Sequence, residues 1–150
     1  MTKNQIKKIL DRALRMLFEK DAEILRVDIN ERSISHKLAT YLEPHFEGWS
    51  VDCEYNRNHD DPKRLDISRR NIPNDDVEAR TVFPDIIVHK RHTDDNLLVI
   101  EVKKTTSQED CNFDKQKLKA FKVQLGYQYA VFIMVDTAQS PSIQLTQIDW

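Results

Sequence analysis

The stretch FPDIIVHKRHTDDNLLVIEVKK, residues 83–104, decides the fold. It contains two apolar segments joined by the polar sequence HTDDN, a pattern that predicts a β-hairpin. Charged residues stand where these strands should be apolar: Asp85 begins the first strand, and Glu101, Lys103 and Lys104 end the second. Charged groups at such positions need either a partner or a function.

The expected register of the hairpin brings three of these residues together. Residues two apart in a strand share a face, so Glu101 and Lys103 point the same way. Folding about a turn centred near residues 93 and 94 pairs Asp85 with residue 101, 102 or 103. Cross-strand neighbours on one face lie about 5 Å apart at Cβ. A register that puts Asp85 on the Glu101 face therefore gathers two carboxylates and an ammonium group.

Such a cluster has a natural chemical use. Two close carboxylates repel, and one takes up a proton unless a cation lies between them. Mg²⁺ and similar cations prefer carboxylate, carbonyl and water oxygens. We expect Asp85, Glu101 and the carbonyl of Val102 to hold a cation that activates water and screens a phosphate. Lys103 would orient that water, help to deprotonate it, or stabilise the pentacovalent phosphate. This is the chemistry of phosphodiester hydrolysis.

The rest of the chain predicts helices and strands around the hairpin. Apolar residues at helical spacing predict helices over 4–20, from Asn30 to Pro44, and from Asp110 or Asn112 to Leu125. Strands are predicted over 49–56 and 127–135, with a weaker edge strand over 142–149. This order predicts one α/β domain over residues 1–150, with a mixed central β-sheet flanked by α-helices.

Several residues outside the hairpin carry their own expectations. The polar stretch from Arg57 to Arg80 predicts a long loop, in which Arg69 and Arg70 are candidates for phosphate contact. The alternation in 49–56 predicts that Tyr55 shares the face of Trp49, with Glu54 on the opposite face. Glu54 could approach the metal, but solvent exposure is the simpler expectation. A surface role is likewise expected for Lys104. The turn histidines His89 and His92 are expected to be exposed, with phosphate contact as the alternative.

The hairpin motif resembles a known family. Pro84-Asp85, then sixteen positions from Asp85 to Glu101, then EVK ending at Lys103, resembles the PD-(D/E)XK nuclease superfamily. The resemblance implies a restriction-endonuclease-like core over about residues 30–135, with the motif on its second and third strands. The first helix then stands outside this core as an extra N-terminal helix. It also implies a site that holds Mg²⁺ or Mn²⁺.

The resemblance extends to two helices. The family often has an acidic residue on the helix before the sheet that supports the metal site, and Glu31 matches it by position. The metal set is then Asp85, Glu101, Val102 and Glu31, and the catalytic set is Asp85, Glu101, Lys103 and Glu31. Polar residues on the helix after the motif are also common, and the candidates here are Asp114, Lys115 and Lys117.

The expected function is that of a divalent-metal-dependent nuclease. It would hydrolyse the phosphodiester bonds of nucleic acid, with DNA as the expected substrate and a homodimer or a partner subunit left open. One alternative is a catalytically inactive module of the same fold that binds nucleic acid or a protein partner. Another is an unrelated α/β protein in which Asp85 merely begins a strand and Glu101 pairs with Lys103.

Composition limits the other possibilities. The formal net charge is −2, so the chain lacks the overall positive charge typical of nucleic-acid-binding domains. Its two cysteines do not suggest a disulfide framework. It has no apolar run of membrane-spanning length and no signal peptide, so we expect a cytoplasmic protein without a membrane partner. No zinc-ligand spacing or glycine-rich phosphate loop is found.

Overall fold

The computed structural model describes residues 1–55, 57–58, 61–62, 64–65, 80–81, 83–108, 111–137 and 142–149. Most of the predicted loop between Arg57 and Arg80, including Arg69 and Arg70, lies outside these residues. The described ends of this segment form two short antiparallel pairs. They are β2 (Arg57–Asn58) with β3 (Asp61–Pro62), and β4 (Arg64–Leu65) with β5 (Arg80–Thr81).

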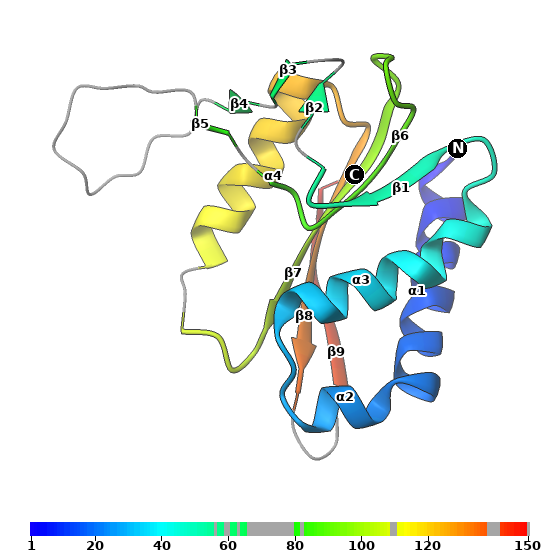
Figure 1. Ribbon diagram of the computed structural model, residues 1–150, viewed down its shortest axis with the longest axis vertical. Helices are drawn as coiled ribbons and strands as arrows, with labels where there is room; N and C mark the ends of the chain where they lie inside the picture. Colours follow the sequence, from blue (N-terminus) through cyan, green and yellow to red (C-terminus); the bar gives the residue numbers. More distant parts are fainter. Residues whose placement is uncertain are drawn as a thin grey trace, which may run out of the picture.

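A five-stranded mixed sheet forms the centre of the molecule (Figure 1). Its strands, in spatial order, are β1 (Ser50–Cys53), β6 (Ile86–His89), β7 (Asn96–Lys104), β8 (Tyr129–Asp136) and β9 (Ser142–Asp149). β7 and β8 are parallel, and the other neighbours are antiparallel. The predicted strand over 127–135 and the edge strand over 142–149 are thus confirmed.

Helices cover both faces of this sheet, as Figure 1 shows. On one face lie α1 (Lys3–Lys20), α2 (Ala22–Arg26) and α3 (Glu31–Leu42), which is followed by the short helix η1 (Glu43–His45). On the other face lies α4 (Cys111–Leu125), which connects β7 to the parallel strand β8. The α/β architecture and the presence of a helix before Asn30 are confirmed, and α2 is an addition.

Local sequence signals explain where these helices begin and end. The side chain of Asn30 accepts a hydrogen bond from the N–H of Ser33 at 2.8 Å, so Asn30 is the predicted N-cap of α3. Pro44 lies two residues after Leu42, the last residue of α3, and is part of η1. Gly126 adopts a φ of +69° directly after α4, a conformation that glycine adopts without strain.

Two clusters of buried residues hold the layers together. The larger packs α1, α2 and α3 against one face of the sheet, with Leu38, Ile100 and Val131 among its members. The smaller packs α4 against the other face, through Val99 and Phe121 among others. Glu101 and Lys103 continue the face of Val99 and therefore point towards α4. The site thus lies on the α4 side of the sheet.

The predicted face of Tyr55 is wrong. Trp49 and Val51 pack against the larger cluster, whereas Tyr55 packs against the smaller one. The intervening Glu54 has a positive φ of +49°, which ends the regular strand alternation after Cys53. A pattern that assumes a regular strand cannot anticipate such a residue.

The hairpin register is the prediction on which the site depends. Ile86 pairs with Ile100, and Val88 pairs with Leu98, with a register shift between Val88 and His89. Continuing this register by one residue places Asp85 opposite Glu101, although the strand itself begins at Ile86. The start of the first strand therefore meets the end of the second, and Asp85 and Glu101 lie on the same side.

Candidate active site

The site forms where β6 has ended and β7 continues alone along one edge. N–H groups at alternate positions of a strand point to the same edge, so those of Val102 and Lys104 both face the side that β6 no longer covers. Val102 N–H donates to Asp85 Oδ2 at 2.7 Å, and Lys104 N–H donates to Glu31 Oε1 at 2.9 Å. Two predicted site carboxylates are therefore fixed by the backbone of the motif strand.

Glu101 is the most buried carboxylate of the site, with 2% of its surface exposed. Its Oε2 lies 2.8 Å from Nζ of Lys117 on α4. Its other oxygen, Oε1, is buried and accepts no hydrogen bond within the part of the chain that the structure describes. A buried carboxylate oxygen without a donor is energetically costly, so this atom marks a place where a further cation or donor is favoured.

Lys103 is also buried, and its ammonium group lies among carboxylates from two helices. Its Nζ lies 3.5 Å from Asp114 Oδ2 on α4 and 3.9 Å from Glu31 Oε2 on α3. These are ion-pair distances, and Oδ2 of Asp114 accepts no hydrogen bond within the described residues. Lys103 therefore bridges the two helix layers at the end of the sheet.

Burial and repulsion shift the protonation of the two central carboxylates. Burial is the main cause that raises the pKa of Asp85, although the hydrogen bond from Val102 opposes it. Burial also raises the pKa of Glu101 well above its usual value, and the negative charge of Asp85 adds to the effect. Two such groups with raised pKa values in one place are typical of functional sites.

Opposite charges do not balance within this cluster. Among the described residues it contains four carboxylates, from Glu31, Asp85, Glu101 and Asp114, and two ammonium groups, from Lys103 and Lys117. With every group ionised, two negative charges remain uncompensated. A divalent cation carries the charge that would neutralise them.

The donors at the site suit magnesium or manganese. Mg²⁺ is commonly bound through one or two carboxylates, with water and substrate phosphate completing its ligands. Asp85 and Glu101 provide two carboxylates, and the carbonyl of Val102 points to the same edge as its N–H. Within the described residues no three His, Cys, Asp or Glu side chains form a group that could hold a metal by themselves. A cation held by two carboxylates and one carbonyl would keep open positions for water and substrate.

The other predicted residues take several places. Glu54 forms an ion pair with Arg32, in which Arg32 Nε lies 2.7 Å from Glu54 Oε1. Both side chains are exposed, so the expected solvent exposure of Glu54 is confirmed. Lys115, another candidate on α4, is exposed and lies over the ring of Phe132 at 5.9 Å. Asp114 and Lys117 were candidates only through the family resemblance, and the docking of α4 brings both into the cluster.

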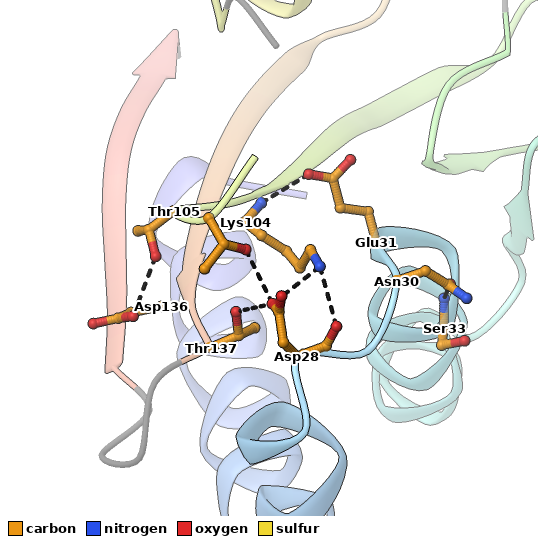
Figure 2. A network of polar contacts seen from close by, with 9 residues as sticks. Asp28, Asn30, Glu31, Ser33, Lys104, Thr105, Asp136 and Thr137 are labelled. Atoms are coloured by element: carbon orange, nitrogen blue, oxygen red, sulfur yellow. Dashed lines mark hydrogen bonds and ion pairs between the residues drawn. The ribbon is translucent and has the colours of Figure 1, made fainter. Parts of the chain in front are cut away.

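The predicted surface role of Lys104 is wrong. Figure 2 shows its side chain within a polar network centred on Asp28, in the segment between α2 and α3. Asp28 Oδ1 accepts hydrogen bonds from Lys104 Nζ at 3.0 Å and from the hydroxyls of Thr106 and Thr137. Asp28 has a φ of +53°, a conformation that Asp tolerates better than most residues. The network joins the entry of α3, and hence Glu31, to the ends of β7 and β8.

His89 is likewise not an exposed turn residue, because only 4% of its surface is exposed. Its Nε2 lies 2.9 Å from Asp52 Oδ2, and Arg91 makes two contacts with the same carboxylate. Burial opposes ionisation of Asp52, but the hydrogen bonds from Arg91 and His89 lower its pKa. Asp52 lies in β1 and His89 in β6, and their side-chain contact lies near the turn of the hairpin, at the end away from the candidate site.

Comparisons of the chain with protein-family models, with curated proteins and with solved structures found no match. No helix within the described ranges has the length and apolar character needed to cross a membrane. Cys53 and Cys111 are free thiols, in line with the sequence expectation.

Proposed function

We propose that the protein is a divalent-metal-dependent nuclease of the PD-(D/E)XK type. The observation that carries the proposal is the Asp85–Glu101 pair at the open edge of β7, where the buried Glu101 Oε1 has no donor among the described residues. Two carboxylates with raised pKa values, a net negative charge and a nearby lysine suit metal-assisted phosphodiester hydrolysis.

The arrangement of elements supports the finer fold proposal. The sequence resemblance implies a helix, a mixed sheet with the motif on its second and third strands, a following helix and a further strand. In this chain α3 precedes the sheet, the motif lies at Asp85 and on β7, and α4 leads to the parallel strand β8. This order supports a restriction-endonuclease-like core.

Each residue has a role that its position permits. Asp85, Glu101 and the Val102 carbonyl would hold Mg²⁺ or Mn²⁺, which when bound lowers the pKa of water and offsets charge on the phosphate. Lys103 would orient the attacking water or stabilise the phosphate, and Glu31 would assist by fixing the end of β7 through the N–H of Lys104. In the reaction an oxygen–phosphorus bond forms to water and one phosphoester bond breaks. The leaving oxygen gains a proton as water loses one.

A second function has one observation in its favour. Lys117 already provides Glu101 with a positive partner at 2.8 Å. An internal cation at this carboxylate would suit a module that keeps the fold but no longer binds metal or cleaves nucleic acid. Such a module would bind nucleic acid or a protein partner without turnover.

Calorimetric titration with Mn²⁺ separates the two, because it requires no choice of substrate. The wild-type chain is compared with Glu101→Gln, which removes a charge from the site, and with Asp95→Asn, which removes one from the exposed turn. Binding by the wild type and by Asp95→Asn, with loss in Glu101→Gln, supports the nuclease and leads to Mg²⁺-dependent cleavage assays on DNA. If the three proteins give the same Mn²⁺ titration curve, no Mn²⁺ binding depends on Glu101, and the non-catalytic module is favoured.

A further inference from the structure

The ammonium group of Lys117 contacts two separate segments of the site. Its Nζ lies 2.8 Å from Glu101 Oε2 on β7, and it donates to the carbonyl of Phe83, before β6, at 3.2 Å. Both charged side chains are largely buried, with 12% of the Lys117 side chain and 3% of the Glu101 side chain exposed. The ammonium therefore joins the two halves of the motif from the α4 side.

The ammonium group of Lys117 forms an ion pair with Glu101, the same carboxylate that we assign to the metal. A divalent cation and the Lys117 ammonium carry the same sign, so close approach of both to Glu101 is electrostatically unfavourable. The Nζ of Lys117 already lies on one side of this carboxylate, 2.8 Å from Oε2. Metal binding must then compete with an internal positive charge.

The position of Lys117 on α4 allows its side chain to move without the helix. Its neighbours Leu118 and Phe121 fix α4 in the smaller buried cluster. Lysine has a long flexible stem whose end readily reaches solvent while the stem stays packed. A change of rotamer can therefore withdraw the ammonium while α4 remains docked.

We propose that Lys117 is an internal cation that neutralises Glu101 until a divalent metal displaces it, and that the released ammonium then binds a substrate phosphate. The inference rests on the proposed function. Displacement breaks the ion pair to Glu101 and the hydrogen bond to Phe83, so metal binds weakly alone. A nucleic acid offers the released ammonium a phosphate partner, so metal and nucleic acid bind cooperatively.

Acylation of lysines by acetic anhydride, followed by peptide mass spectrometry on the full chain, tests the displacement directly. In the metal-free protein Lys117 should be protected, whereas the exposed Lys119 on the same helix should react freely. Saturating Mn²⁺ should raise the acylation rate of Lys117 at least about tenfold, because it opens this buried contact, and leave Lys119 unchanged. Glu101→Gln should expose Lys117 to the reagent without metal.

Three results would overturn the inference, and they are distinguishable. Calorimetric Mn²⁺ binding with Lys117 still protected would refute displacement and leave the metal site in place. Absence of Mn²⁺ binding both to the chain alone and to the chain with a DNA duplex would refute both the inference and the proposed function. The third test uses Asp85→Asn, which should bind no metal. If Mn²⁺ raises the acylation rate of Lys117 in this variant as much as in wild type, Lys117 responds to something other than metal bound at the site.

Discussion

Asp85 Oδ2 accepts the N–H of Val102 at 2.7 Å, one residue before the strand that contains Ile86 begins. This contact replaces a ladder hydrogen bond that β6 would have made if it were longer. The next N–H along the same edge, that of Lys104, is accepted by Glu31 of α3. Carboxylates thus complete this edge of the sheet, and the same carboxylates would serve the proposed chemistry.

Asp85→Asn should abolish cleavage without unfolding the protein. The amide oxygen of Asn can still accept the N–H of Val102, while the charge needed to hold a cation is lost. Turnover should fall at least about 100-fold. Because burial raises the pKa of Asp85, ionisation of this carboxyl lowers the stability of the folded protein as pH rises, and the variant should melt no lower than wild type at pH 8. Cleavage assays and thermal melts check this, and normal cleavage would contradict the mechanism.

Lys103→Met should separate catalysis from metal binding. The substitution removes a positive charge from a cluster with excess carboxylates, so Mn²⁺ should bind at least as tightly as in wild type. Turnover should nevertheless fall at least about 100-fold, because the ammonium that orients water or stabilises the phosphate is lost.

Lys104→Met is the matched control for Lys103→Met. It removes an adjacent ammonium that contacts Asp28, but it keeps the backbone N–H that holds Glu31. We expect turnover within severalfold of wild type, together with reduced stability. Equal loss of turnover in the two variants would show that Lys103 has no special part in catalysis.

Glu31→Gln and Glu31→Ala should differ in stability. Gln can still accept the N–H of Lys104, whereas Ala leaves it without this acceptor. Glu31→Ala should therefore lose about 1–2 kcal/mol of unfolding free energy, as expected for one hydrogen bond to a charged acceptor. Both variants should reduce Mn²⁺-dependent turnover because both remove a carboxylate from the site. Urea unfolding and cleavage assays would detect the difference, and equal stability of Gln and Ala would show that the contact is not stabilising.

The pairing of the hairpin could be predicted from the sequence, but the way the helices pack against the sheet could not. Alternation and a turn centre near residues 93 and 94 placed Asp85 opposite residue 101, 102 or 103, because antiparallel pairing is set by turn position. The observed register, with its shift between Val88 and His89, selects Glu101. The partner of Glu101 was not evident, because the position of Lys117 depends on how α4 rotates against the sheet. Periodicity identified the buried side of α4 through Leu118 and Phe121 without fixing that contact.

The other errors share a physical cause. Tyr55 was placed on the wrong face because the positive φ of Glu54 interrupts the strand, and the sequence has no glycine there to signal it. Lys104 and His89 were expected at the surface because charged residues usually lie there. Each instead has a carboxylate partner from a distant part of the chain, Asp28 for Lys104 and Asp52 for His89. Such long-range pairs leave no local pattern.

Asp28 should stabilise the protein in a pH-dependent way. Hydrogen bonds from Thr137, Lys104 and Thr106 lower the pKa of Asp28 from 3.8 to about 2. A carboxyl group with a lowered folded pKa contributes stability that is present above its unfolded pKa and is lost as pH falls through its folded pKa. Wild type should therefore be more stable than Asp28→Asn at pH 5, and this difference should shrink as the pH falls from about 4 to about 2.

Urea unfolding of both proteins across this pH range measures that difference. Asn tolerates the positive φ at residue 28, so the variant tests the charge rather than the backbone. Thr137→Val supplies the control, because it removes one donor to Asp28 and should raise the pKa of that carboxyl towards its usual value. In Thr137→Val, the stabilisation by Asp28 should therefore disappear at a higher pH than in wild type. A wild-type advantage that is constant from pH 5 to pH 2 would mean that Asp28 stabilises this corner of the fold through packing rather than through its charge.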